Sequence, residues 1–160
     1  MAVLADARRR RRRYLRDITR PPRSLLPPSG IYHVTGRGVA RCAIFHDDAD
    51  RRLFLGRLRL LAAELELECH VYCLMTNHFH LLTDTSLVKL STAMHRLLGP
   101  YAQRFNVKYA RVGHLFQERF HARFVADDAQ FERTFEYIRN NPVAAELCAT
   151  ADDWPWTGSI

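Results

Sequence analysis

Two histidines, His78 and His80, stand two positions apart in a stretch whose residue types are typical of a β-strand. Successive side chains of a strand point to opposite faces, so both imidazoles leave one face while Phe79 between them enters a core on the other. Their Cβ atoms then lie about 6–7 Å apart, which lets both rings bind one divalent cation. The pair is either half of a metal site on a rigid element or two histidines on an ordinary sheet face.

A second pair, Tyr137 and Asn141, lies at the end of a helix predicted over 127–140. At 100° per residue the two side chains are about 40° apart, so they are neighbours one turn apart, away from the centre of the apolar stripe. Two interpretations are open. Either Tyr137 packs at the edge of the core and Asn141 ends the helix before Pro142, or the phenol is a nucleophile and the amide oxygen a third metal ligand.

Length and composition indicate one folded domain. The chain has 160 residues, of which 48% are hydrophobic and 26% charged, as in ordinary globular proteins. No apolar run approaches the roughly 18 residues needed to span a membrane, and no secretory h-region follows the N-terminus, so we expect a cytoplasmic protein. The four cysteines lack zinc-site spacing and are expected to be free thiols, with Cys69 and Cys73 on one strand face.

The net charge of +7 is concentrated at the N-terminus, where the first 30 residues hold nine arginines and two aspartates. Six of these arginines are consecutive, and four prolines follow, so we expect residues 1–29 to form a basic, disordered arm. Such an arm would either grip DNA phosphates without reading sequence or be a solvated tail. The folded domain is predicted over 30–150, with a C-terminal tail over 151–160.

Hydrophobic periodicity and turn residues predict the elements in the order strand, helix, strand, strand, helix, strand, helix. Their expected ranges are 30–38, 47–65, 68–75, 78–83, 86–105, 116–125 and 127–140. The fifth element contains Gly99-Pro100, which should kink or divide it. His33 on the first strand is expected to be structural, with a supporting role near the histidine pair left open.

Between positions 96 and 123 basic residues greatly outnumber acids, and aromatic residues are interleaved with them. This composition predicts a patch for single-stranded nucleic acid, the alternative being a solvated helix face above core aromatics. The nucleic-acid-binding residues predicted in this stretch are Arg104, Lys108, Arg111, Arg119 and Arg123, and Arg37 is predicted to bind nucleic acid from outside it.

Several stretches together resemble a known family. The triplet 78–80 resembles the His-hydrophobe-His signature of HUH endonucleases, and YIRNNPV at 137–143 resembles the tyrosine helix of the single-tyrosine transposases within that group. GIYHVTGRG at 30–38, LMTNHFHLL at 74–82 and GHLFQERF at 113–120 are similar to the branch called REP-associated tyrosine transposases. The likeness runs in register from about residue 30 to about 147.

The resemblance implies an α+β, ferredoxin-like (RRM-like) fold, an antiparallel sheet with helices packed on one face. It implies His78 and His80 as ligands of Mg²⁺ or Mn²⁺, Tyr137 as the nucleophile, and the polar residue one turn later, Asn141, as the third ligand. The implied activity is metal-dependent cleavage and rejoining of single-stranded DNA through a 5′-phosphotyrosine, at hairpin-bearing, REP-like sequences.

The sequence leaves three points about assembly and activity open. The protein could act as a monomer or as a homodimer that pairs Tyr137 with the partner's histidines. It could instead be a non-catalytic nucleic-acid-binding protein of RRM-like fold. It could also be a domesticated descendant that binds a stem-loop but cuts poorly.

Overall fold

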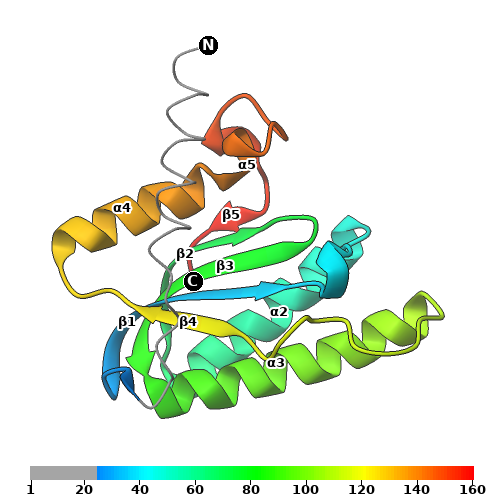
Figure 1. The fold of residues 1–160 in the computed structure, drawn as a ribbon, viewed down its shortest axis with the longest axis horizontal. Coiled ribbons are helices and arrows are strands. Elements are labelled where there is room, and N and C mark those ends of the chain that lie inside the picture. The colour runs from blue at the N-terminus through cyan, green and yellow to red at the C-terminus, as the bar shows by residue number, and fades with distance from the viewer. Residues whose placement is uncertain (1–24) are drawn as a thin grey trace.

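The computed structural model describes residues 25–160, so residues 1–24 of the predicted basic arm lie outside it (Figure 1). The β-strands are β1 (Ser29–Arg37), β2 (Glu68–Leu74), β3 (His78–Ser86), β4 (His121–Phe124) and β5 (Thr157–Gly158). The α-helices are α2 (Asp48–Leu65), α3 (Leu87–Lys108), α4 (Asp128–Arg139) and α5 (Asn141–Ala144), with short 3-10 helices at η2 (Val39–Arg41) and η3 (Ala151–Asp153). None of the helices in this part of the chain combines the length and apolar character that crossing a bilayer requires.

The five strands form one sheet in the order β4-β1-β3-β2-β5, and every neighbouring pair is antiparallel. This confirms the predicted α+β class with an antiparallel sheet. Helices α2 and α3 pack side by side on one face, as predicted, whereas α4 covers the opposite face against β2 and β3, so the helices do not all lie on one face as expected (Figure 1). The sheet therefore has a core on each side, and the face from which His78 and His80 project lies under α4.

A β-bulge corrects the expected orientation of two cysteines. The pairing of β2 with β3 shifts register between Cys69 and Val71, so one residue is inserted between them. Cys69 consequently faces the core under α2 and α3, whereas Cys73 faces the core under α4. Alternation from the sequence alone had placed both on the same face.

Helix α3 runs through Pro100 without being divided, contrary to one of the two outcomes expected. Proline has no N–H, so the carbonyl of Arg96, four residues earlier, loses its usual helical donor. The side chain of Arg57 on α2 supplies a replacement, because its Nη2 donates to the Arg96 oxygen at 3.2 Å. A contact from the neighbouring helix thus compensates for the missing hydrogen bond.

The C-terminal segment 151–160, predicted as a tail, adds strand β5 to the edge of the sheet beside β2. Trp154 donates from its indole Nε1 to the Leu74 carbonyl at 3.1 Å. The guanidinium of Arg51 lies 5.5–5.6 Å from the ring centroids of Phe45, Trp154 and Trp156. These cation–π contacts attach the segment to the start of α2.

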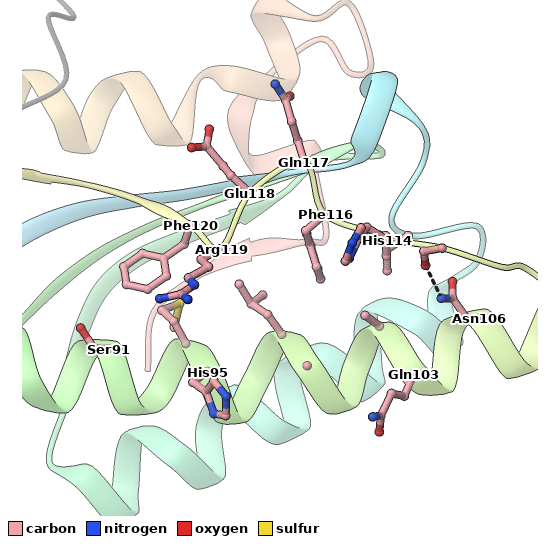
Figure 2. A pocket seen from close by; sticks show the side chains of 16 residues that line it. Ser91, His95, Gln103, Asn106, His114, Phe116, Gln117, Glu118, Arg119 and Phe120 are labelled. Atoms are coloured by element: carbon pink, nitrogen blue, oxygen red, sulfur yellow. Dashed lines mark hydrogen bonds between the residues drawn. The ribbon is translucent and has the colours of Figure 1, made fainter. Parts of the chain in front are cut away.

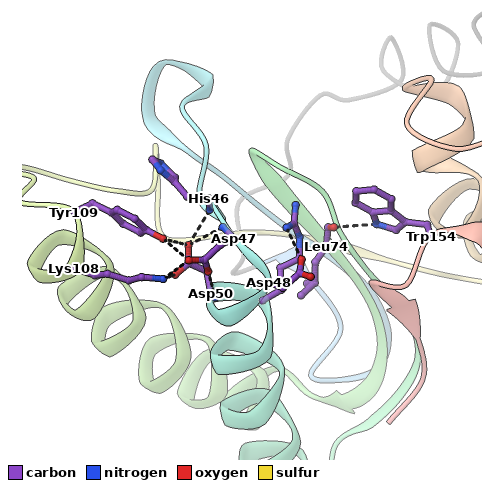
Figure 3. A network of polar contacts seen from close by, with 9 residues as sticks. His46, Asp47, Asp48, Asp50, Leu74, Lys108, Tyr109 and Trp154 are labelled. Carbon is purple, nitrogen blue, oxygen red and sulfur yellow. Dashed lines mark hydrogen bonds and ion pairs between the residues drawn. The ribbon is translucent and has the colours of Figure 1, made fainter.

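A polar network joins the start of α2 to the end of α3 (Figure 3). Asp47 caps α2 by accepting from the Asp50 N–H at 2.8 Å. Lys108 Nζ donates to Asp47 at 2.7 Å and to Asp50 at 2.8 Å, and the Tyr109 hydroxyl donates to Asp50 at 2.8 Å. The network therefore fixes where α3 ends.

Acid should weaken the hydrogen bonds and ion pairs between the start of α2 and the end of α3. Hydrogen bonds from Lys108 and from the Asp50 N–H lower the pKa of Asp47 to about 2. Burial would raise the pKa of Asp50, but hydrogen bonds from Lys108 and from the His46 N–H more than offset it, so this pKa is also lowered. Carboxyls whose pKa is lower in the folded than in the unfolded chain stabilise the fold above about pH 4, and lose that contribution as the pH falls through the folded value.

We therefore expect the unfolding temperature to fall between about pH 4 and pH 2, as measured by circular dichroism at a series of pH values. Lys108→Met should lower the unfolding temperature at neutral pH and make its fall in acid shallower, because the aspartates lose their cationic partner. An equally steep fall in the variant would show that this network is not the acid-sensitive element.

Candidate active site

His78 and His80 lie on the face of β3 that α4 covers, and both are buried, with exposed fractions of 8% and 5%. Their ring centroids are 4.9 Å apart. Phe79 and Leu81, which alternate with them, lie in the core under α2 and α3. The two imidazoles therefore form one compact pair on a strand that is central in the sheet.

A hydrogen bond sets the tautomer of His78. Its Nδ1 lies 2.7 Å from the Asn77 amide oxygen, which can only accept, so Nδ1 carries the proton. The amide nitrogen of Asn77 donates to the Arg41 carbonyl at 3.2 Å, which is consistent with the oxygen facing the ring. Nε2 of His78 then has the lone pair, the arrangement that a metal-binding histidine requires.

His33, on β1, lies directly against His80. Its Nε2 is 2.9 Å from His80 Nδ1, and the two rings stack with centroids 5.2 Å apart. Burial, followed by the nearby charges of His121 and Arg123, lowers the pKa of His33 to about 3. His33 is therefore neutral at ordinary pH, and it can accept the Nδ1 proton of His80.

Tyr137 comes to this cluster from α4. Its half-buried ring lies with its centroid 5.6 Å from that of His80 and 6.1 Å from that of His33, edge to face in both cases. The structure thus brings all three rings together within one chain.

Asn141 begins the short helix α5, just after α4 ends at Arg139, and only 3% of it is exposed. Asn140 between the two helices donates from its side chain to the Glu136 carbonyl, which closes the end of α4. Asn141 as a third ligand stays a prediction. The described residues contain no group of three His, Cys, Asp or Glu placed to hold a metal.

The donor set is nevertheless compatible with a divalent cation. Two neighbouring imidazoles are held on a rigid strand, and Nδ1 of each is hydrogen-bonded to a residue outside the pair. This is the usual arrangement around metal-binding histidines, whose outer nitrogen is fixed by a neighbour. Imidazole ligands suit transition metals such as Mn²⁺, while an amide oxygen would suit Mg²⁺ as well.

Five of the six residues predicted to bind nucleic acid fall into two groups, and the sixth, Arg123 on β4, is half-buried. The side chains of Arg37, Arg104 and Arg119 are exposed and make no hydrogen bond or ion pair with any residue in the described range. Lys108, by contrast, is held by two aspartates, and Arg111 lies over the Phe105 ring. The first group is therefore available to phosphates, and the second is used in the fold.

The aromatic residues of the predicted patch belong to the core. Tyr101, Phe105 and Phe120 are 1%, 2% and 6% exposed. Bases cannot stack on rings that are covered in this way, so the alternative of core aromatics beneath a solvated surface is correct for these three. Helical spacing does not distinguish the two cases, because an inward and an outward stripe have the same period.

Two features of the structure were not predicted from the sequence. The His33–His80 contact joins residues 47 positions apart, and only the pairing of β1 with β3 brings them together. A cavity between α3 and the segment 113–120 likewise depends on how the segment before β4 folds back (Figure 2). The one sequence signal for it was the resemblance of GHLFQERF at 113–120, to which no role was assigned.

The chain is similar to known proteins in sequence and in fold. Residues 28–141 match the family model described as IS200-like transposase. The fold is similar to that of a REP-associated tyrosine transposase solved bound to a REP hairpin, with a TM-score of 0.68, 14% identity, and coverage of 88% of this chain and 82% of that one. A candidate transposase of Deinococcus radiodurans R1 aligns with a TM-score of 0.48 and 18% identity over 77% of this chain and 97% of its own.

The search of curated proteins gave no match. The family match, however, covers well over half of the chain, and it includes both histidines, Tyr137 and Asn141. The chain belongs to the IS200-like transposase family.

Proposed function

We propose that this transposase cleaves and rejoins single-stranded DNA by transesterification, with Tyr137 as the nucleophile, at a phosphate held beside His78 and His80. The observation that carries the proposal is the contact between the Tyr137 and His80 rings, whose centroids are 5.6 Å apart within one chain. In this proposal the scissile phosphate lies between the histidines and the phenol. The catalytic residues would then belong to a single chain, in a monomer or in each half of a homodimer.

His78 and His80 would bind the metal through Nε2, and the Asn141 side-chain oxygen is the proposed third ligand. When bound, Mg²⁺ or Mn²⁺ supplies a Lewis acid that polarises a non-bridging phosphate oxygen. Asn77 and His33 orient the two rings by holding a proton at Nδ1 of each.

Tyr137 Oη attacks phosphorus, so that the P–Oη bond forms and the bond to the 3′ oxygen breaks. The phenol proton must leave during the attack, because a protonated phenol is a weak nucleophile, and the departing 3′ oxygen takes up a proton. The product is a 5′-phosphotyrosine and a free 3′-OH. Attack by another 3′-OH reverses the step and joins strands, so the phosphodiester is conserved and no nucleotide cofactor is consumed.

The proposed substrate is a stem-loop with single-stranded flanks, of REP-like sequence, because the similar structure holds a REP hairpin. Arg37 is the proposed phosphate contact nearest to the site, since it pairs with His78 across β1 and β3 and its side chain is exposed. A non-catalytic RRM-like module is disfavoured, because Tyr101, Phe105 and Phe120 of the predicted patch are buried in the core and cannot stack bases.

The test is to incubate the protein with Mn²⁺ and a panel of stem-loops labelled at either end. A 5′-phosphotyrosine predicts that the 3′-labelled fragment stays attached to denatured protein while the 5′-labelled fragment is released with a free 3′-OH. Retention of the 5′-labelled fragment on the protein would indicate a 3′-phosphotyrosine instead. Absence of any adduct across the panel would favour a protein that binds DNA without cutting it.

His33 offers a test of the site that does not depend on cleavage. Replacing it with alanine removes the acceptor for His80 Nδ1–H, and should weaken Mn²⁺ binding about 10- to 100-fold, as measured by isothermal titration calorimetry. His33→Gln, whose amide oxygen can accept the same proton, should recover part of the affinity. Unchanged Mn²⁺ affinity in a folded His33→Ala protein would mean that His33 does not orient a ligand.

A further inference from the structure

Helix α4, which carries Tyr137, buries few of its own side chains. Of its 12 residues only Thr134 and Ile138 are buried, and the ring of Tyr137 is half-buried. A helix with few buried side chains moves more readily on its sheet than one with a fully buried apolar face. The separation between the phenol and the histidines on β3 therefore depends on other contacts at the C-terminal end of α4.

The C-terminal segment 150–160 supplies such contacts. Arg139, the last residue of α4, donates from Nη2 to the Asp152 carboxylate at 2.5 Å. Trp154 packs against the apolar cluster between α4 and the sheet, of which Ile138 is a member. The ion pair lies at the surface, where such pairs contribute little to stability. Trp154 is therefore the main contact between the segment and the side of the sheet that α4 covers.

Trp154 also binds the strand that leads to the histidines. Its indole Nε1 donates to the Leu74 carbonyl at 3.1 Å, and the Leu74 N–H donates to the Trp156 carbonyl at 2.9 Å (Figure 3). Leu74 in turn pairs with Phe79, the residue between the two histidines, in the ladder of β2 and β3. Trp154 thus connects the α4 side of the molecule with the part of the sheet that carries the histidines.

A buried cation fixes the indole ring in place. Only 8% of Arg51 is exposed, and its guanidinium carbon lies 5.6 Å from the centroid of the Trp154 ring. Its Nε has no hydrogen-bond partner among residues 25–160, and its ion pair with Asp48 is long, at 3.7 Å. Cation–π contacts strengthen when the cation is shielded from water. The position of the Trp154 ring is therefore set by Arg51 as well as by Leu74.

We propose that Trp154 is a positioning residue for the transesterification: it connects the C-terminal end of α4 to β2, and so keeps Tyr137 beside His78 and His80. Trp154 itself binds neither the metal nor the DNA. The inference rests on the proposed function and adds a residue, outside the catalytic cluster, on which the reaction rate depends. Displacing a reacting group by about 1 Å can lower a rate about 100-fold, so a small shift of α4 is sufficient.

The experiment measures single-turnover adduct formation by the full chain at saturating stem-loop and Mn²⁺. Trp154→Ala removes the ring and the donor, and should lower the rate about 100-fold. Trp154→Phe keeps a ring without the N–H, and should lower the rate by only about tenfold. The affinities for the stem-loop and for Mn²⁺ should stay near wild type in both variants, because β3 and its histidines are unchanged. If Trp154→Ala does not fold, Trp154→Phe carries the same comparison.

Trp156→Ala is the matched control. The Trp156 ring also lies 5.6 Å from the Arg51 guanidinium, but it packs against the cluster under α2 and α3, and its backbone carbonyl stays to bind Leu74. This variant should lose stability and keep a rate near wild type. An equal loss of rate in Trp154→Ala and Trp156→Ala would overturn the proposal, and so would a wild-type rate in Trp154→Ala.

Backbone hydrogen exchange gives a second measurement, which needs no cleavage. Trp154→Ala should speed exchange of the α4 amides and leave β1 and β3 as slow as in wild type. Faster exchange throughout the chain would indicate a general loss of stability and would overturn the positioning role. Selective exchange in α4, in a protein whose wild type forms no adduct, would keep the connection and reject the transesterification. An adduct in wild type, with rate and α4 exchange both unaffected by Trp154→Ala, would do the reverse.

Discussion

Tyr137→Phe should lower the rate of covalent adduct formation by about 1,000-fold or more, because phenylalanine removes the nucleophilic oxygen and nothing else. The ring keeps its edge-to-face contacts with His80 and His33, so the fold should be unchanged. The measurement is single-turnover adduct formation on a labelled stem-loop with Mn²⁺. Binding of the same DNA should remain within a small factor of wild type, because phosphate contacts lie elsewhere.

Tyr109→Phe is the matched control for this prediction. Tyr109, just past the end of α3, also has a hydroxyl near the surface, but this hydroxyl donates to Asp50 at the start of α2, with Asp47 at 3.2 Å. The variant should lose some stability and still form the adduct. If Tyr137→Phe reacts as fast as wild type, another residue is the nucleophile, and the contact with His80 is only packing.

His78→Ala and His80→Ala should each abolish detectable cleavage and weaken Mn²⁺ binding by about 100-fold or more, beyond the effect of an orienting neighbour such as His33. Each variant removes an imidazole that we propose binds the cation directly. DNA binding measured by electrophoretic mobility shift in the absence of metal should be largely retained. The same calorimetric titration then ranks the three histidines in a single experiment.

His46→Ala controls for the loss of a histidine in general, since His46 stacks on Tyr109 at the surface and lies outside the site. It should bind Mn²⁺ as wild type does. Should His78→Ala and His80→Ala both keep wild-type Mn²⁺ affinity, the pair is no metal site, and a metal-independent role for the histidines would have to replace the mechanism proposed here.

The basic patch illustrates where sequence patterns were insufficient. Charge counting predicted Arg104 and Arg119 as nucleic-acid-binding residues, and the structure leaves their side chains exposed. The same counting included Lys108, which the fold uses to neutralise two aspartates some 60 residues away along the chain. A lysine on an exposed helix face has the same local pattern whether its partner is a phosphate or a distant carboxylate.

Local periodicity by itself determined the arrangement within each element. It placed His78 and His80 on one face of their strand, because this relation depends only on residue spacing. The one-helix relation expected for Tyr137 and Asn141 does not hold, because α4 ends at Arg139 and Asn141 begins α5. Tertiary structure alone decided that α4 covers the histidine face and that His33 approaches His80 from β1. The physical reason is that spacing fixes the face a side chain takes on its own element, whereas contacts between elements depend on strand order and on the path of the chain between them.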